Sequence, residues 1–342
     1  MLRDRWWFGR ATKAFTLQWH LTNACPLRCR HCYDRSPRSE LTLADALQVL
    51  EDLRAFGRRH GVEPRICLTG GDPLLYPHFW ELYVAIAEAG LPVSILGNPA
   101  PASVIRRLLK HQRPLYYQVS LEGLREHNDA IRGPGHFERT TEFLADAREA
   151  GLRTGVMLTL TRANLDQVVP LGTWLGGRTG RFNFNRVSQV GEASNLEAVT
   201  PVEFTEFLRQ YLAARRQNPV LGVKDNLFNI LREHYDRPRY GGCTGYGCGA
   251  AFNFVALLPD GEVHACRKFA SPLGHLRESG LEAIYASRRA RRYRRGPDAC
   301  HRCRLRDVCR GCPAVVSGNG LDPFVDRDPY CFRDRLPRGQ FR

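Results

Sequence analysis

The first two-thirds of the chain alternate between short apolar runs and longer stretches with helical periodicity, and this alternation constrains the fold more than any other feature. Six short runs are predicted strands, at 15–21, 65–69, 92–97, 115–121, 154–160 and 181–187. Apolar residues at three- and four-residue steps predict helices at 41–60, 78–90, 101–112, 136–150 and 165–175. Six β–α units predict a parallel sheet of the α/β class. This order fits an open doubly wound sheet or a barrel, and in both the loops at the carboxyl ends of the strands hold the ligand.

Three cysteines, Cys25, Cys29 and Cys32, lie on the loop that leaves the first predicted strand, with the spacing Cys-x3-Cys-x2-Cys. A [4Fe–4S] cluster normally takes four cysteine ligands, so three cysteines on one tight loop leave one iron open to another ligand. A zinc site with His31 as fourth ligand is the alternative, but zinc sites usually pair two half-sites separated by about a dozen residues or more. The spacing therefore indicates catalysis at a cluster.

This loop resembles the signature of the radical S-adenosylmethionine (SAM) superfamily, in which an aromatic residue, here Tyr33, follows the third cysteine. In that family SAM chelates the open iron through its amino and carboxylate groups, and reductive cleavage yields methionine and a 5′-deoxyadenosyl radical. The resemblance implies a partial (β/α)6 barrel of the TIM type, radical SAM oxidoreductase activity, and an external electron donor of the flavodoxin or ferredoxin type.

Further motifs of the family follow the later strands. Residues 70–72, Gly-Gly-Asp, are similar to a Gly-Gly-Glu segment that holds the SAM amino group, and Asn98 is similar to the Asn of a Thr-Asn-Gly run. Residues 120–133 resemble the family's Ser-Leu-Asp-Gly…His-Asp…Arg-Gly stretch, with Glu122 in place of Asp. Capping of the following turn is the alternative role of Glu122. The resemblance implies one set of cofactor-binding residues: Tyr33, Gly70, Gly71, Asp72, Asn98, Ser120, Glu122 and Arg132.

Eight more cysteines lie in the last hundred residues, enough for two cubane ligand sets. Their order is a pair, then Gly-x4-Cys after a predicted hairpin turn at 257–261, then Cys-x2-Cys-x5-Cys-x2-Cys and a distant final cysteine. This order resembles the SPASM extension of radical SAM enzymes, with one residue missing from the last gap. The resemblance implies auxiliary cluster I on Cys243, Cys248, Cys266 and Cys312, and auxiliary cluster II on Cys300, Cys303, Cys309 and Cys331. Two zinc sites are the alternative, because Cys-x2-Cys pairs suit zinc equally well.

The chain is thus predicted to have three parts, a partial barrel (1–195), a helical bridge (196–240) and a SPASM-type iron–sulfur domain (241–342). The bridge has two helical stretches, which run from 200 to about 217 and from 225 to 235. The remaining cysteine, Cys67, lies inside an apolar strand and is interpreted as a buried core thiol.

The composition predicts where the protein is located and what kind of partner it binds. Twelve cysteines among 342 residues, without a recognisable secretory signal or an apolar run of about 18 residues, predict a cytoplasmic protein whose thiols bind metals. A net charge of +15 favours acidic partners, such as an acidic peptide or nucleic acid. The arginine-rich run 288–295 suggests nucleic acid, but such a run is more often a solvated helix face, and no RNA-binding module is recognisable.

Enzymes with a SPASM extension mostly act on peptides or proteins, forming thioethers, cross-links or heterocycles in ribosomally made precursors, or formylglycine in sulfatases. In sulfatase-maturing enzymes an Asp proposed as a base follows the Gly-x4-Cys cysteine, whereas this chain has Arg267 followed by Lys268. A guanidinium is a poor base at neutral pH. We therefore predict a precursor-peptide maturase that uses SAM and three [4Fe–4S] clusters. Sulfatase maturation, RNA modification and a non-catalytic electron carrier are the alternatives, and Arg267 and Lys268 either bind a substrate carboxylate or are solvated.

Overall fold

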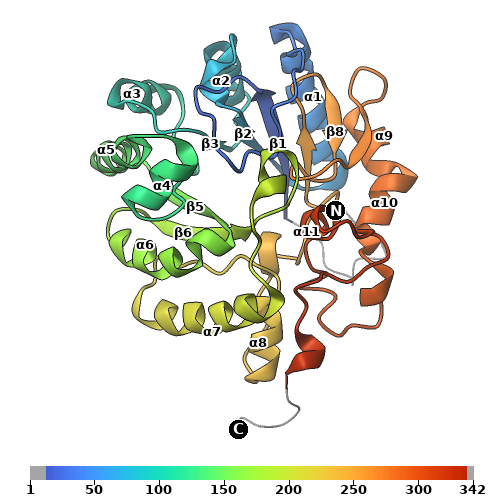
Figure 1. Ribbon diagram of the computed structural model, residues 1–342. Helices are drawn as coiled ribbons and strands as arrows, with labels where there is room; N and C mark the ends of the chain where they lie inside the picture. Colours follow the sequence, from blue (N-terminus) through green and yellow to red (C-terminus); the bar gives the residue numbers. More distant parts are fainter. Residues whose placement is uncertain (1–12, 337–342) are drawn as a thin grey trace.

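The computed structural model describes residues 13–336, and its centre is one sheet of nine strands within that range. The first six strands are parallel and follow one another across the sheet in chain order (Figure 1): β1 (Ala14–Thr22), β2 (Glu63–Gly70), β3 (Val93–Leu96), β4 (Tyr117–Ser120), β5 (Thr154–Leu160) and β6 (Arg181–Arg186). They confirm the six predicted strands and the α/β class. Because these strands all run the same way, their carboxyl ends lie along one edge, where the following loops meet.

Helices that alternate with these strands cover the outside of the sheet (Figure 1): α1 (Leu43–His60), α2 (Phe79–Glu88), α3 (Ala102–His111), α4 (Arg125–Arg132), α5 (His136–Glu149) and α6 (Val168–Trp174). Five of them were predicted. Helix α4 was not predicted, because it buries only Asn128 and so lacks an apolar periodicity.

Helix α1 illustrates how the sequence encodes these elements. Thr42 caps it by accepting a hydrogen bond from the Asp45 N–H, and the Asp45 carboxylate accepts one from the Thr42 N–H, which forms a capping box. Gly61 ends the helix in the left-handed conformation, at φ 61°. On its buried face Phe56 packs against Phe15 of β1 with 4.4 Å between the ring centroids. Burial of one such side chain contributes about 1.5–3 kcal/mol and fixes α1 against β1.

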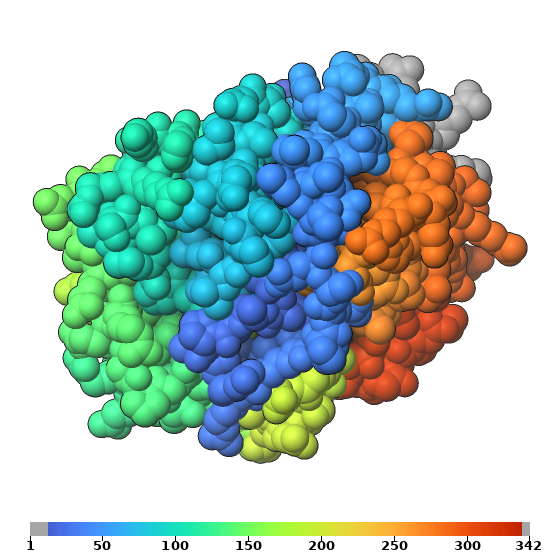
Figure 2. Space-filling view, turned by 90° about the horizontal axis from the view of Figure 1, so that it is seen from above, coloured from blue at the N-terminus to red at the C-terminus, as the bar shows by residue number. Residues whose placement is uncertain are grey.

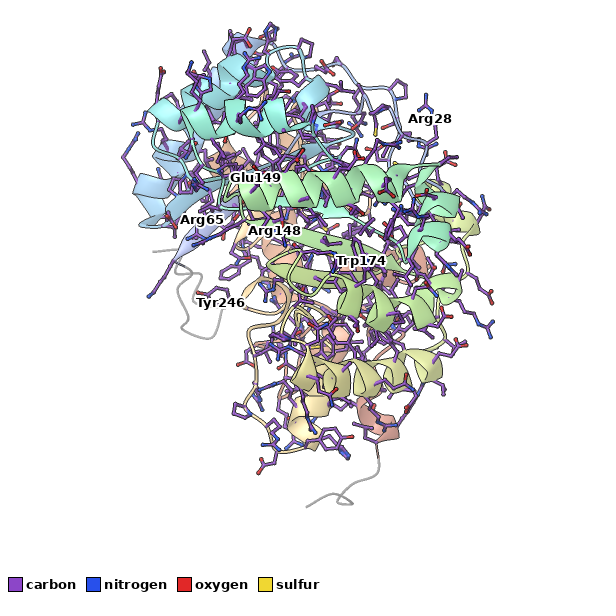
Figure 3. The ribbon with its side chains drawn as sticks, turned by 90° about the vertical axis from the view of Figure 1, so that its left-hand side faces the viewer. Arg28, Arg65, Arg148, Glu149, Trp174 and Tyr246 are labelled. Atoms are coloured by element: carbon purple, nitrogen blue, oxygen red, sulfur yellow. The ribbon has the colours of Figure 1, made fainter. Side chains whose placement is uncertain are left out.

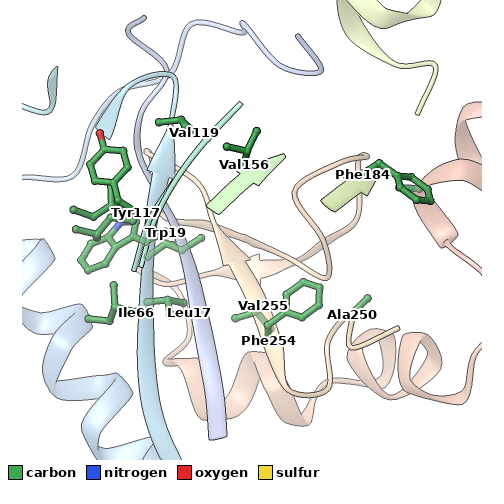
Figure 4. Packing of buried hydrophobic residues seen from close by; sticks show 14 of the residues in the cluster. Leu17, Trp19, Ile66, Tyr117, Val119, Val156, Phe184, Ala250, Phe254 and Val255 are labelled. Atoms are coloured by element: carbon green, nitrogen blue, oxygen red, sulfur yellow. The ribbon is translucent and has the colours of Figure 1, made fainter. Parts of the chain in front are cut away.

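The two faces of the curved sheet differ in polarity. Leu17, Trp19 and Tyr117 point outward and are buried beneath the helices, as Figure 4 shows for the centre of the core. Thr16 and Gln18, which alternate with them along β1, point inward and line an interior cavity. The period-two pattern thus separates an apolar outer layer from a polar inner wall.

The C-terminal region extends the same sheet. Strand β7 (Phe254–Leu257) pairs in parallel with β1, and β8 (Glu262–His264) and β9 (Pro272–His275) follow as antiparallel strands. The predicted hairpin at 257–261 is confirmed, with Gly261 at φ 101°. Arg38, which follows the cysteine loop, donates hydrogen bonds to Asp260 and Glu262 beside this turn. The cysteine loop and the hairpin are therefore held together.

The described residues contain five further α-helices: α7 (Pro201–Gln217), α8 (Phe228–His234), α9 (Leu281–Ala286), α10 (Arg288–Arg295) and α11 (Pro313–Gly318). The bridge segment 196–240 contains α7 and α8, close to the two predicted stretches. An isolated parallel bridge between Phe182 and Leu221 attaches this segment to β6. From above, residues 13–60 lie between the helices of the barrel and the C-terminal region (Figure 2). Among the described helices, none combines the length and apolar character needed to cross a bilayer.

Candidate active site

The cysteine loop is seated directly on the glycine pair that follows β2. The Gly71 N–H donates to the Thr22 carbonyl at 2.8 Å, and the Asp72 N–H donates to the Ala24 carbonyl at 2.8 Å. A Cβ atom on Gly70 would lie 2.2 Å from the Thr22 oxygen, and one on Gly71 would lie 2.3 Å from the Ala24 oxygen. Both positions therefore require glycine, because any side chain would push the cysteine loop away.

A pocket of about 230 Å³ lies at the carboxyl ends of the parallel strands. All three thiols, Cys25, Cys29 and Cys32, line it. Six of the eight predicted cofactor residues also line it, namely Tyr33, Gly70, Gly71, Asn98, Ser120 and Arg132. The other two, Asp72 and Glu122, lie behind the pocket wall, where they hold residues that do line it.

Asp72 orients Asn98 toward a thiol. The Asn98 amide donates to one Asp72 carboxylate oxygen at 3.1 Å and to the Cys25 sulfur at 3.6 Å. The other Asp72 oxygen accepts from the Leu74 N–H at 3.2 Å, and the Tyr117 hydroxyl donates to the Asn98 carbonyl at 2.8 Å. Burial raises the pKa of Asp72. The Asp replacing the family's Glu thus acts on Asn98 in this structure.

Glu122 and Arg132 form a buried ion pair beside a second thiol. Arg132 donates to one Glu122 oxygen through Nε at 2.9 Å and Nη2 at 2.6 Å, and through Nη1 to the Cys29 sulfur at 3.8 Å. The other Glu122 oxygen accepts from the Thr159 N–H at 2.8 Å. Burial opposes ionisation of Glu122, but His31, Arg132 and this N–H hold its pKa below the usual value. Burial lowers the pKa of His31 to about 4, so Arg132 is the cation that balances Glu122 at neutral pH.

A second, larger cavity of about 560 Å³ runs along the inner wall of the sheet and contacts the same residues as the first at their junction, including Gln118, Arg267 and Lys268. Arg28 lines the SAM-side pocket, and Arg65 and Tyr246 line the larger cavity; in Figure 3 Arg28 lies toward the right of the view and the other two lie toward the left.

Cys67 lies on the wall of the larger cavity. It is 4% exposed, which agrees with its interpretation as a buried thiol, and burial raises its pKa to about 11. The strand that carries it alternates between the apolar core and the cavity, so this thiol faces the cavity side of the wall.

The four cysteines predicted for auxiliary cluster I, Cys243, Cys248, Cys266 and Cys312, all line the larger cavity. Burial, and then the neighbouring thiol of Cys312, raise the pKa of Cys248. Burial also raises the pKa of Cys312 to about 11, with Cys266 among its neighbours. The interleaved assignment therefore brings together thiols that are far apart in the sequence.

The cysteines predicted for auxiliary cluster II influence one another's pKa. Burial, and then Cys303 and Cys331, raise the pKa of Cys300 to about 11. Burial, with a contribution from Cys331, raises that of Cys309. The short gap before Cys312 is bridged by Arg310 and Gly311, both in the left-handed conformation, at φ 61° and 65°. The Arg310 guanidinium donates to the carbonyls of Tyr246 and Cys248, which offsets the strain of its backbone.

Asp328 ties the barrel to the C-terminal thiols. Its carboxylate accepts two hydrogen bonds from Arg186 of β6, both at 2.8 Å, and further bonds from the N–H groups of Cys312 and Tyr330. Arg186 also donates to Asp225 at 2.8 Å. None of these three charged residues belongs to a motif or spacing pattern in the sequence, so the sequence alone did not point to them.

Arg267 reaches from the hairpin cysteine into the SAM-side pocket. Its Nη1 donates to the Thr69 hydroxyl at 2.8 Å, and its guanidinium carbon lies 5.9 Å from the centre of the Tyr33 ring. Lys268 lines both cavities, and burial lowers its pKa to about 8. Arg267 is therefore held by Thr69 rather than simply solvated.

The donor set fits iron–sulfur clusters. In a cubane each iron takes one thiolate, so the ligands surround a shared space. Three of the predicted ligand thiols line the SAM-side pocket, four line the larger cavity, and the remaining four influence one another's pKa. Within the described part of the chain, no group of three or more His, Cys, Asp or Glu side chains could hold a single metal ion. The three loop thiols would hold the SAM-binding cluster, with Asn98 and Arg132 donating to its sulfur ligands.

Sequence profiles identify both parts of the chain. The profile of the radical SAM superfamily matches residues 19–175, and that of the SPASM iron–sulfur cluster-binding domain matches residues 248–313. The chain is a radical SAM enzyme with a C-terminal SPASM domain. These matches confirm the predicted family, enzyme class and fold, and they imply SAM and iron–sulfur clusters as cofactors.

Relatives of this radical SAM enzyme include proteins with different substrates. The AdoMet-dependent heme synthase of Methanosarcina barkeri is 26% identical over 92% of this chain and 95% of its own length. The mycofactocin maturase MftC of Mycobacterium tuberculosis is 29% identical over 92% of this chain and 82% of its own. The crystal structure of Streptococcus suis SuiB bound to its precursor peptide SuiA has the same fold, with a TM-score of 0.72 at 17% identity over 93% of this chain and 76% of SuiB.

Proposed function

We propose that this radical SAM enzyme is a peptide maturase that oxidatively modifies a ribosomally made precursor peptide. The observation that carries the proposal is the larger cavity, which is lined by Arg65, Tyr246 and four thiols and shares lining residues with the SAM-side pocket. An extended chain can occupy such a cavity while one of its residues lies beside the SAM-side pocket. The mycofactocin maturase and the SuiB complex with its precursor peptide support this substrate class.

Each part of the chain has a role in this proposal. Residues 1–195 bind SAM, and residues 241–342 carry two auxiliary [4Fe–4S] clusters. Residues 196–240 connect these two parts of the chain. When bound, SAM and the reduced loop cluster supply the 5′-deoxyadenosyl radical. Asn98 and Arg132 donate to the loop thiols and the glycine pair fixes the loop, so these residues would hold a bound cluster beside the pocket. An external flavodoxin- or ferredoxin-type protein supplies electrons, and the net charge of +15 favours such an acidic donor.

Formylglycine formation is the weaker alternative. The residue after the hairpin cysteine is Arg267, and although burial opposes its charge, Tyr33 and the nearby thiols hold its pKa above the ordinary value. A group that stays protonated cannot accept the substrate proton.

A tetrapyrrole is the second candidate substrate. The heme synthase matches nearly its whole length, and the junction of the two cavities is lined by Arg267 and Lys268, which suit carboxylates.

The deciding experiment uses anaerobically reconstituted enzyme with SAM and a reductant. Short peptides encoded beside the gene and Fe-coproporphyrin III are each incubated with it, and products are identified by mass spectrometry. We expect one peptide to lose two hydrogen atoms or more in step with 5′-deoxyadenosine formation. A variant with the three loop cysteines replaced by Ala is the control and should give no product. Turnover of the porphyrin, with none of any neighbouring peptide, would contradict the proposal.

A further inference from the structure

Two cations at the junction of the two cavities have no carboxylate partner. Arg267 and Lys268 line both cavities, and no described Asp or Glu lies within ion-pair distance of either. Within residues 13–336, the one hydrogen bond from the Arg267 guanidinium goes to the neutral Thr69 hydroxyl. Arg186, on the same junction, is different, because Asp225 and Asp328 balance it.

Positively charged side chains lie close together around Arg267 and Lys268. Lys224 lines the larger cavity and repels Lys268, and Lys268 and Arg267 repel each other. Like charges are brought together at an enclosed site only where the protein or a ligand supplies the opposite charge. Thiolates of Cys266 and Cys312 balance part of this charge when they bind a cluster, but the Arg267 side chain leads away from them toward Thr69 and Tyr33.

The position of this pair suits substrate anchoring. Arg267 and Lys268 face the SAM-side pocket on one side and the larger cavity, with the four auxiliary thiols, on the other. We propose that Arg267 and Lys268 bind a carboxylate of the substrate at this junction and so place a neighbouring carbon toward SAM. Under the proposed function the carboxylate belongs to a peptide, either an Asp or Glu side chain or the C-terminus. The planar guanidinium makes two parallel hydrogen bonds to a carboxylate, and the ammonium adds a third.

Trifluoroacetate is a suitable probe, because it carries one carboxylate and a fluorine signal. Anaerobically reconstituted holoenzyme is reduced with dithionite, which makes its clusters paramagnetic, and titrated with trifluoroacetate; 19F line broadening is measured, with trifluoroethanol as the neutral control. We expect saturable broadening by trifluoroacetate alone. The variant R267Q/K268Q should weaken binding about tenfold, as for the loss of charge-assisted hydrogen bonds, and R267K should restore part of it.

The matched control is R288Q/R289Q, which removes the same charge from exposed positions on α10. It should leave the titration unchanged, and iron content and circular dichroism should show that all variants fold. An identical response in R267Q/K268Q and wild type, or displacement of trifluoroacetate by saturating SAM, would overturn the proposal. The first result would leave the pair only to balance cluster charge, and the second would assign it to SAM.

Competition identifies the source of the carboxylate. N-acetylglycine presents a terminal carboxylate, N-acetylglutamate α-amide a side-chain carboxylate, and coproporphyrin III a propionate. Displacement by either amino-acid derivative supports the site and names the peptide group. Displacement by the porphyrin alone supports the carboxylate site but contradicts peptide maturation, so the two proposals fail separately. No displacement by any of the three would overturn the site.

Discussion

Replacing Arg132 by Met tests the buried ion pair that connects the SAM-side pocket to the fold. Glu122 is 1% exposed, and among the described residues Arg132 is its one cationic partner at neutral pH. Removing one member of a buried pair leaves an uncompensated charge and costs about 3–5 kcal/mol. At about 2 °C per kcal/mol, near the lower end for large domains, the expected fall in the unfolding temperature is about 6–10 °C.

The assay is thermal unfolding followed by circular dichroism under anaerobic conditions, at one fixed scan rate. The double variant E122Q/R132M removes both charges and should recover more than half of the lost stability, because no buried ion remains. SAM affinity should behave differently. It should fall about 10- to 100-fold in both variants, because Arg132 lines the pocket and the loss of a charge-assisted hydrogen bond costs about 1.5–3 kcal/mol.

Two results would refute this reasoning. A loss of less than about 1 kcal/mol in R132M would mean that Glu122 is not held as an anion in the fold. Unchanged SAM affinity in R132M would mean that Arg132 acts on the cysteine loop alone.

Three further predictions follow from the other contacts. Reconstituted protein should contain about twelve iron atoms, measured by colorimetric assay. Replacing the three loop cysteines by Ala should remove about four iron atoms and abolish SAM cleavage, whereas C67A should remove none. Stoichiometric zinc in the protein would contradict the assignment of the thiols to iron–sulfur clusters. Burial lowers the pKa of His136 to about 3, so the unfolded state binds more protons below pH 6.5 and stability should fall as the pH drops toward 3. Between pH 6.5 and 5 the loss is about 2 kcal/mol, measured by denaturant unfolding, and an equal slope in H136Q would count against it. D328N should lower the iron content toward about four atoms while SAM cleavage persists, because Asp328 accepts hydrogen bonds from the N–H groups of Cys312 and Tyr330. Full iron retention in D328N would show that these hydrogen bonds do not position the auxiliary thiols.

Short-range sequence patterns were sufficient to predict most of the strands and helices and the cysteine loop of the site. Strand and helix periods are encoded in the order of apolar residues, so the six β–α units were predicted, and parallel strands then place all their following loops at one edge. Cysteine spacing is also local information, which is why the loop cysteines and the glycine pair could be assigned. Helix α4 was missed for the same reason, because its polar sequence carries no apolar period although its last residue, Arg132, lines the pocket.

Only the tertiary structure decided which side chains face one another across the molecule. Asp72 and Glu122 were predicted to bind SAM, and the fold places their carboxylates in hydrogen-bond contact with Asn98 and Arg132, which line the pocket. The pairing of β7 with β1 brings the hairpin cysteine beside the barrel, and with it Arg267 reaches the pocket of the loop cysteines. The hydrogen bond from Arg267 to Thr69 joins two residues about two hundred positions apart in the chain, so the partners of a side chain at this junction depend on distant parts of the sequence. A sequence determines the chemistry that each residue brings, but the partners come from the packing of distant strands, because hydrogen bonds and ion pairs act only over a few ångströms.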